Sequence, residues 1–329
     1  MKPNIDGGVR RIALLRPNHR LGNALLLTPA LNELARQYPD ASVDVVTSGR
    51  AGTAVFAGFA NVADVLSFPR LSCRAPLATL KTFSELRSRR YDLAIDPMPH
   101  SRSGRFLLST VNAHERVGYS DGCYVRDRVL TRSAHIRHAP KSYAEIPVHL
   151  LRHTGRTTPL PTPDSTPACP RIALSADERL HGAHFLSAAN GGQVTLAVFA
   201  NATGSKCYSR DWWRAVLERV RHPIPNLNIV EFVPDDNEPR LPGLAQPKFT
   251  RDLRLLGSAL AAASLVVSAD CGVMHLADAA DASVLGLFKT TDPLVYGPRN
   301  ARSTWMNAAD SKPAEVAARV ESLLRARRI

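Results

Sequence analysis

The hydrophobic positions of this chain follow two patterns that alternate along its length. Short apolar runs, typical of strands buried on both faces of a parallel sheet, are separated by longer stretches with apolar residues at helical spacing. In the first half, strands are predicted at residues 11–16, 42–47, 62–68 and 91–96. Helices are predicted between them at 24–38 and 76–90.

The second half repeats the alternation. Strands are predicted at 193–199, 227–233, 265–269 and 283–288. Helices are predicted at 211–220, at 250–263 with Thr250 as N-cap, and at 313–327. Strands that alternate with helices in this way predict βαβ units and an α/β fold with parallel sheets.

A proline-rich segment separates the two halves. Residues 157–170 contain five prolines, which excludes an internal helix or a central strand. We therefore predict two Rossmann-like domains, 1–156 and 171–329, joined by this linker, with their sheets facing a central cleft that holds a ligand. The last helix is expected to pack either in the second domain or back on the first.

The composition is that of a globular protein. Hydrophobic residues make up 44% of the 329 positions, and no apolar run reaches the roughly 18 residues of a membrane span. Residues 1–8 lack the apolar core of a signal peptide, so a cytoplasmic protein is expected. The five cysteines are dispersed without zinc-site spacing, which indicates reduced thiols and no metal site.

The charge is strongly basic, with 42 Lys and Arg against 29 Asp and Glu, a net charge of +13. Basic residues gather at 81–105 and 126–152. Aromatic residues make up only 6% and no nucleic-acid-binding motif is present. An anionic substrate or a phosphate-bearing membrane surface explains the charge at least as well as DNA does.

The segment from Asp270 to Ala280 carries the clearest candidate chemistry. Asp270, Gly272 and His275 follow a predicted buried strand and open an Ala-rich helix. Glycine lets the backbone approach a phosphate closely, and a helix N-terminus favours its negative charge. The alternative is a structural strand–helix turn in which Asp270 caps the helix.

A second candidate follows the first strand of the second half. Thr203, Ser205 and Lys206 combine hydroxyls with a cation, as phosphate sites do, although the order of a P-loop is absent. Lys206 is interpreted as a diphosphate ligand or as an exposed lysine. Asp235, in the loop after the next strand, is expected to contact a sugar hydroxyl or to lie in a solvated turn.

The first strand–helix turn carries Arg20, Gly22 and Asn23. Asn23 is a good helix cap, and this is the role that its chemistry alone favours. An amide cannot accept a proton at neutral pH, so Asn23 cannot be a general base. Arg102 and Arg105, after the strand that ends at Asp96, either bind an anionic acceptor or lie in a solvated loop.

These motifs together resemble glycosyltransferase family 9, the bacterial heptosyltransferases. The turn at 20–31 is similar to the family's opening motif, and residues 91–96 with Arg102 are similar to its mid-domain segment. Residues 116–119 resemble a short R-[IV]-G element, and 270–277 resemble the D-[ST]-G-x-x-H-[LF]-A donor motif. The similarity runs over nearly the whole chain.

The resemblance implies a GT-B fold and inverting transfer of heptose from ADP-heptose to the inner core of lipopolysaccharide, without a metal or another cofactor. It implies donor contacts from eight residues: Thr203, Ser205, Lys206, Asp235, Asp270, Cys271, Gly272 and His275. It implies acceptor contacts from Arg20, Gly22, Arg102 and Arg105. The expected partner is an anionic glycolipid at the cytoplasmic face of the inner membrane, and no nucleic acid is expected.

Two positions depart from the family pattern. Asn23 stands where the family has an Asp that is thought to deprotonate the acceptor, and losing a base typically lowers a rate by roughly 10²–10⁴. Asp96 and His100 are the candidates to replace it. Cys271 replaces a hydroxyl residue and leaves the backbone donors intact. The alternatives are therefore another nucleotide sugar or acceptor, or a catalytically impaired homologue that only binds.

Overall fold

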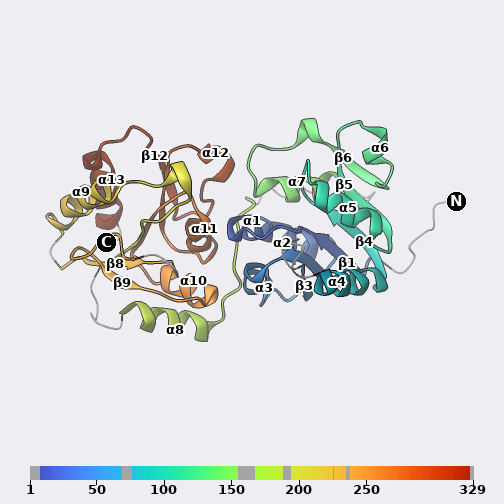
Figure 1. The fold of residues 1–329 in the computed structure, drawn as a ribbon, viewed down its shortest axis with the longest axis horizontal. Helices are drawn as coiled ribbons and strands as arrows, with labels where there is room; N and C mark the ends of the chain where they lie inside the picture. Colours follow the sequence, from blue (N-terminus) through green and yellow to red (C-terminus); the bar gives the residue numbers. More distant parts are fainter. Residues whose placement is uncertain are drawn as a thin grey trace. The chain divides into compact units, whose positions relative to one another are not determined.

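The computed structural model describes residues 8–68, 76–154, 167–187, 194–224, 226–234 and 238–326. The chain divides into two compact units, Met1–Ala168 and Cys169–Ile329. In each unit the described residues form one six-stranded parallel sheet with helices packed against it (Figure 1). The predicted α/β class with two Rossmann-like sheets is confirmed. Of the predicted linker, residues 157–166 lie outside the described residues.

The first unit contains a sheet in the order β3-β2-β1-β4-β5-β6. The strands are β1 Arg11–Leu15, β2 Ser42–Ser48, β3 Val62–Phe68, β4 Tyr91–Asp96, β5 Ala113–Ser120 and β6 Arg132–His135. The helices are α1 Leu21–Leu25, α2 Thr28–Gln37, α3 Arg50–Phe56, α4 Pro76–Ser88, α5 Arg102–Thr110, α6 Tyr124–Asp127, the 3-10 turn Ile136–His138 and α7 Glu145–Thr154. From β1 to β3 each new strand is added toward one edge of the sheet, and from β4 to β6 toward the other edge. The order of strands therefore reverses between the neighbours β1 and β4.

The second unit contains a sheet in the order β12-β11-β10-β7-β8-β9. The strands are β7 Thr195–Phe199, β8 Asn228–Phe232, β9 Gln246–Lys248, β10 Leu265–Ala269, β11 Val284–Phe288 and β12 Thr304–Asn307. The helices are α8 Ala176–Ser187, the 3-10 turn Gly204–Lys206, α9 Arg210–Arg221, α10 Leu253–Ala261, α11 Gly272–Ala279, α12 Pro293–Tyr296 and α13 Pro313–Arg325. Here the reversal lies between β7 and β10.

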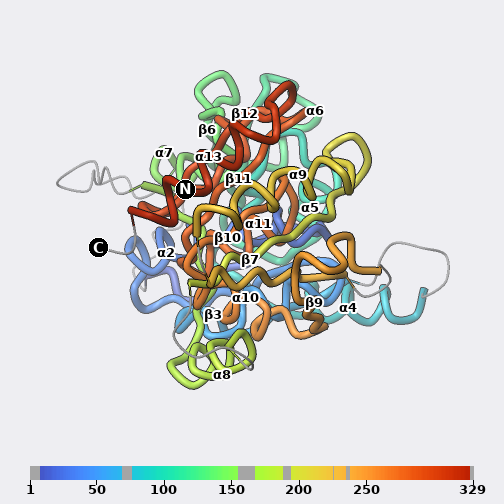
Figure 2. Tube along the Cα trace, turned by 90° about the vertical axis from the view of Figure 1, so that its left-hand side faces the viewer, coloured from blue at the N-terminus to red at the C-terminus, as the bar shows by residue number. Residues whose placement is uncertain are grey.

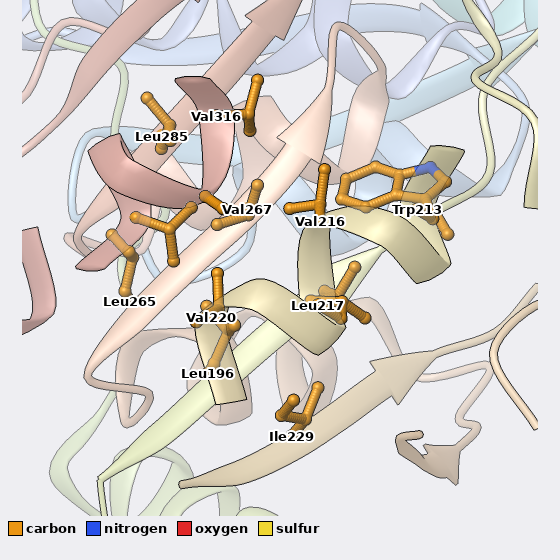
Figure 3. Packing of buried hydrophobic residues seen from close by; sticks show 14 of the residues in the cluster. Leu196, Trp213, Val216, Leu217, Val220, Ile229, Leu265, Val267, Leu285 and Val316 are labelled. Carbon is orange, nitrogen blue, oxygen red and sulfur yellow. The ribbon is translucent and has the colours of Figure 1, made fainter. Parts of the chain in front are cut away.

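The core of the second unit lies between its sheet and two helices. Trp213 and Val216 of α9 are fully buried and face the strand residues Leu196 and Val267 (Figure 3). Helix α13 adds Val316, Val320 and Leu324 to the same buried cluster. The last helix, for which the sequence left two positions open, thus packs in the second unit.

The predicted helix at 24–38 is wrong in one respect, because it is two helices. Helix α1 ends at Leu25, and α2 begins at Thr28 with Pro29 in its first turn. Proline has no N–H and its ring clashes with the carbonyl four residues earlier, so one continuous helix cannot pass through Pro29.

Two of the predicted side-chain caps, at Thr250 and Asn23, are also wrong. The N-cap of α10 is Asp252, which accepts hydrogen bonds from Arg254 N at 2.8 Å and Leu255 N at 3.2 Å. Thr250 instead accepts one bond from Asp252 N, at 3.1 Å. Asn23 lies inside α1, whose N-cap is Arg20 without a side-chain bond. A carboxylate caps better than a hydroxyl here because it also complements the helix dipole.

Several elements escaped prediction because their sequences lack a clear apolar pattern. Strand β5 begins with His, Glu and Arg among its first four residues, and the edge strand β12 is only four residues long. None of the helices formed by the described residues has the length and apolar character that a membrane crossing requires.

Trp213→Ala is expected to lower the free energy of unfolding of the second unit by about 3–5 kcal/mol, because it empties a fully buried site. The measurement is urea unfolding followed by circular dichroism. Trp305→Ala is the matched control, since Trp305 is 41% exposed and its truncation should change stability by less than about 1 kcal/mol. Equal effects of the two substitutions would contradict this assignment of the core.

Candidate active site

The predicted site residues of the second unit gather where its sheet reverses. Strands β7 and β10 are neighbours, and the chain leaves them toward opposite edges of the sheet. The loop after β7 carries Thr203 and Lys206, and the loop after β10 carries Asp270 and Cys271. In open α/β sheets, ligands bind outside the carboxyl ends of the strands at this kind of point.

Asp270 is the centre of this site. One carboxylate oxygen, Oδ2, accepts from Lys206 Nζ at 2.5 Å and from Thr291 Oγ1 at 2.5 Å. The other, Oδ1, lies 3.6 Å from His275 Nε2. Asp270 and His275 are buried, whereas the Lys206 side chain stays about one-third exposed. The lysine is therefore held by its carboxylate partner while part of its side chain remains open to a ligand.

The protonation of Asp270 follows from these contacts. Burial alone would raise its pKa, but the interactions with His275, Lys206 and Thr291 outweigh burial and bring the pKa well below the ordinary value. The carboxyl is ionised at neutral pH. An ionised Asp270 fixes the position of a cation next to a helix N-terminus.

Helix α11 begins directly after Asp270. Its N-cap residue is Cys271, which makes no side-chain cap hydrogen bond, so the interpretation of Asp270 as the cap is wrong. The Cys271 thiol lies 3.4 Å from Ser268 Oγ, and burial raises its pKa. The first-turn N–H groups of α11 start at Gly272, and those of Val273 and Met274 lie beside the Cys271 thiol. A helix N-terminus of this kind can bind an anion.

The loop after β7 brings Lys206 to Asp270 through a short 3-10 turn. Thr203 is the N-cap residue of this turn and makes no side-chain cap bond. Gly204 has φ +63°, a left-handed conformation that glycine adopts without strain. Ser205 is exposed, so its hydroxyl and that of Thr203 border the site without being tied to it.

The carboxylate expected after β8 is not settled by the described residues. Asp235 lies outside them. Glu231, on β8, is fully buried and accepts from Arg240 N at 2.9 Å and Leu241 N at 3.0 Å. Its carboxylate thus orders residues 240–241, and burial raises its pKa.

The candidate residues of the first unit also follow neighbouring strands at a reversal. Arg20, Gly22 and Asn23 come after β1, and Asp96 and His100 come at the end of β4 and after it. The Asn23 side chain is partly exposed and makes no hydrogen bond with the residues that the structure describes. Its amide is free to contact a ligand.

Asp96 is a buried carboxyl without well-aligned hydrogen bonds. Within the described chain neither of its oxygens accepts a well-aligned hydrogen bond, but Arg105 Nε forms an ion pair with Oδ2 at 3.5 Å. Burial raises the pKa of Asp96 to about 7, against the opposing charges of Arg105 and Arg16. Gly104 makes room for this carboxyl, because a Cβ there would lie 2.4 Å from Oδ1.

A cavity of about 170 Å³ lies within the first unit and is lined by Arg105, the ion-pair partner of Asp96. Its lining includes the predicted residues His100, Arg102 and Arg105, together with Tyr119 and Arg126. His100 has φ +57°, an unusual value for a residue with a side chain. The structure therefore brings together the basic and catalytic candidates that follow β4.

The arginines of the cavity differ in how they are held. Arg105 donates to Tyr119 O at 2.6 Å, to Arg126 O at 3.0 Å and to Asp127 Oδ1 at 3.4 Å. Its guanidinium mainly braces β5 and α6 against α5. Arg102 is exposed and has no carboxylate partner among the described residues. Arg102 is thus the cation best placed to receive an anionic ligand.

Sequence reasoning missed Thr291, which bonds Asp270, and the cavity residues Tyr119, Asp121 and Arg126. Thr291 follows the buried strand β11 and therefore lies at the same sheet edge as Asp270, which was the available signal. Tyr119 belongs to β5, Asp121 to the loop after it and Arg126 to α6, and neither element was predicted. Among the described residues, no three His, Cys, Asp or Glu side chains are grouped in a metal-binding arrangement.

The sequence model of glycosyltransferase family 9 (heptosyltransferase) matches residues 79–323, about three-quarters of the chain. This chain belongs to glycosyltransferase family 9. It is therefore a glycosyltransferase, and the resemblance stated from its motifs is confirmed. The match includes the Asp270 motif, the Lys206 loop and the segment from Asp96 to Arg126.

Solved structures of the family share this fold. A family 9 glycosyltransferase from Veillonella parvula has a TM-score of 0.81 at 16% identity, with 99% of each chain covered. The E. coli ADP-heptose lps heptosyltransferase II has a TM-score of 0.75 at 17% identity, with 97% of this chain and 100% of that chain covered. E. coli heptosyltransferase WaaC with ADP has a TM-score of 0.73 at 17% identity, with 95% and 99% covered. The predicted GT-B class is confirmed, and a search of curated proteins found no match.

The raised pKa of Asp96 predicts how the stability of this family 9 enzyme depends on pH. Between the ordinary value of 3.8 and about 7, the folded protein binds more protons at this carboxyl than the unfolded chain does. The free energy of unfolding should therefore fall as pH rises through this window. From about pH 5 to pH 8 the wild type should lose roughly 1–3 kcal/mol more than Asp96→Asn, measured by urea unfolding. If the stability of the wild type and of Asp96→Asn changed with pH in the same way, the Asp96 carboxyl would not have a raised pKa in the folded protein.

Proposed function

We propose that this glycosyltransferase transfers heptose from ADP-heptose to an anionic sugar of the lipopolysaccharide inner core, with inversion and without a metal ion. The observation that carries the proposal is the pairing of Lys206 with ionised Asp270 at the uncapped N-terminus of α11. A lysine and the N-terminal backbone N–H groups of a helix suit a diphosphate that gains charge as it leaves.

In the proposed reaction the acceptor hydroxyl oxygen attacks the anomeric carbon of the heptose from the side opposite the diphosphate. The bond between this carbon and the diphosphate oxygen breaks, and the electron pair leaves with ADP. Lys206 and the α11 backbone stabilise that developing charge, while Asp270 and His275 hold the lysine and the helix start in place. Arg20, Gly22 and Arg102 are proposed to contact the acceptor.

The acceptor hydroxyl must lose its proton, and Asn23 cannot take it. Two groups of the first unit can: His100, which lines the cavity, and Asp96, whose pKa of about 7 suits proton transfer at neutral pH. Arg105 links the cavity to Asp96, because it lines the cavity and its Nε lies 3.5 Å from the Asp96 carboxylate.

Asn23 is also the observation that favours a second candidate function. A homologue that binds nucleotide sugar or core oligosaccharide and transfers slowly would keep Lys206 and Asp270 and lack the usual base. A different nucleotide sugar or acceptor is the remaining alternative, because the Lys206 site recognises the diphosphate and leaves the sugar open.

ADP and ADP-heptose are expected to stabilise the wild-type protein against heat, by about 2.7 kcal/mol at one hundred times the Kd. Lys206→Ala removes a charge-assisted contact to the diphosphate that is worth about 1.5–3 kcal/mol. At the same concentration its ligand-induced gain should therefore fall to about 0.3–1.3 kcal/mol. The readout is a thermal-shift series with ADP, UDP and GDP, each compared with the ligand-free form of the same variant. Lys312→Ala, an exposed lysine of the same unit, is the matched control.

Selective stabilisation by ADP that Lys206→Ala loses and Lys312→Ala keeps is the expected result. Stabilisation by UDP or GDP instead would assign another donor. No stabilisation by any nucleotide would remove the donor site at Lys206.

Asn23→Asp is expected to raise kcat by roughly 10–10², because it restores a carboxylate base at the first turn. Turnover of the nucleotide sugar with a soluble core-sugar acceptor is the measurement. Asn23→Ala separates the base from simple contact with the acceptor and should not raise kcat. A fall in kcat with Asp at this position would assign Asn23 a positioning role and leave the proton to Asp96 or His100. Asp96→Asn and His100→Ala then distinguish these two.

A further inference from the structure

The large apolar side chains that the first unit exposes are confined to three successive helices. Among its described residues, the exposed ones are Leu77 (81%) and Leu80 (63%) on α4, Phe106 (61%) on α5, and Tyr124 (83%) and Val125 (67%) on α6. Scattered exposed apolar residues are ordinary, but five on one run of helices mark an interaction surface. We refer to these five residues as the apolar face.

The three helices are neighbours. Phe83 of α4 stacks on Phe106 of α5, with ring centroids 6.3 Å apart. Arg105 of α5 donates to Arg126 O and Asp127 of α6. Figures 1 and 2 show α6, α5 and α4 in the same succession along one side of this unit in two perpendicular views. The apolar face therefore lies along one side of the first unit.

Positive charge surrounds the apolar face. Lys81, Arg87, Arg102 and Arg128 are exposed, and none has a carboxylate partner among the described residues. The acidic residues nearby are already paired: Glu85 with Arg89, Asp121 with Arg126 and Asp127 with Arg105. Residues 1–168 hold 23 Lys and Arg against 13 Asp and Glu, a net charge of +10, while residues 169–329 hold only +3.

Helix α6 and the residue after it have the amino-acid composition that is typical of a membrane-binding segment. Tyr124 and Val125 are consecutive, highly exposed and followed by Arg126 and Arg128. Tyrosine places an apolar ring and a polar hydroxyl at a water–lipid boundary, and arginines beside it attract anionic headgroups. Separate projecting side chains on three helices suit a fluid bilayer better than the shaped surface of a protein.

We propose that the apolar face is the surface by which this enzyme docks on an anionic phospholipid bilayer. Arg126 joins it to the cavity of the first unit, because this residue belongs to α6 and also lines that cavity with Arg102. An acceptor sugar anchored in the bilayer would then reach the cavity without leaving the membrane. This inference deepens the proposed function and rests on it for the identity of the acceptor, but vesicle binding is independent of transfer.

The test is flotation of the full chain with acceptor-free vesicles of phosphatidylcholine alone or mixed with phosphatidylglycerol. The wild type should bind the anionic vesicles at least about tenfold more strongly than the neutral ones, and added salt should weaken the binding. Tyr124→Ser with Val125→Ser should lower the partition coefficient about tenfold. Arg128→Gln and Lys81→Gln should each lower it about fivefold.

Leu180→Ser with Leu294→Ser is the matched control, since both are exposed leucines of the second unit. These two substitutions should leave vesicle binding unchanged. Binding that is insensitive to Tyr124 and Val125, or no binding to anionic vesicles, overturns the proposal. Self-association in analytical ultracentrifugation that the Tyr124 and Val125 substitutions abolish would overturn it in favour of a contact between copies of this chain.

Measurements of turnover distinguish the docking surface from the proposed transfer reaction. The Tyr124 and Val125 double variant should keep its kcat on a soluble acceptor fragment and lose rate on the same acceptor embedded in vesicles. Failure of transfer on both acceptors, with vesicle binding intact, would count against the proposed reaction and leave the docking surface standing.

Discussion

Each unit of this protein depends on a parallel sheet that is covered by helices. Such a sheet satisfies its backbone internally and turns the carboxyl ends of all its strands to one edge. Where the chain reverses its travel across the sheet, the two loops that leave neighbouring strands diverge and open a space at that edge. The reversals between β1 and β4 and between β7 and β10 hold the candidate residues, so the fold determines where chemistry is possible before any single side chain is considered.

Two buried carboxyls illustrate opposite uses of this edge. Asp270 has three partners and stays ionised, which makes it a fixed anchor for Lys206. Asp96 has no well-aligned hydrogen bond in the described structure and a raised pKa, which makes it a group that can change its charge near neutral pH. The first arrangement suits permanent recognition of an anion, and the second suits the movement of a proton.

The sequence alone was enough to predict the class of fold and the pairing of motifs with strand ends. Asp270, Lys206 and Asp96 follow buried apolar runs, and a parallel sheet brings such positions to one edge. The partners of these residues were harder to predict. Thr291 lies in the loop after the predicted strand β11, and Arg126 belongs to α6, a short helix without a clear apolar pattern. Asp252 replaced Thr250 as a cap because neighbouring polar residues compete for one helix end. Contacts between distant segments depend on packing that local periodicity does not encode.

The bond between Lys206 and Asp270 joins residues 64 positions apart. During synthesis at about 5–20 residues per second, Lys206 leaves the ribosome several seconds before Asp270. Strand β7 is likewise made several seconds before β10, with which it pairs. The candidate site of the second unit is therefore complete only when Asp270 and the start of α11 emerge after the central strand β10. Nucleotide binding, as proposed for this site, would therefore begin in a nascent chain only after β10 has paired with β7 in the second sheet.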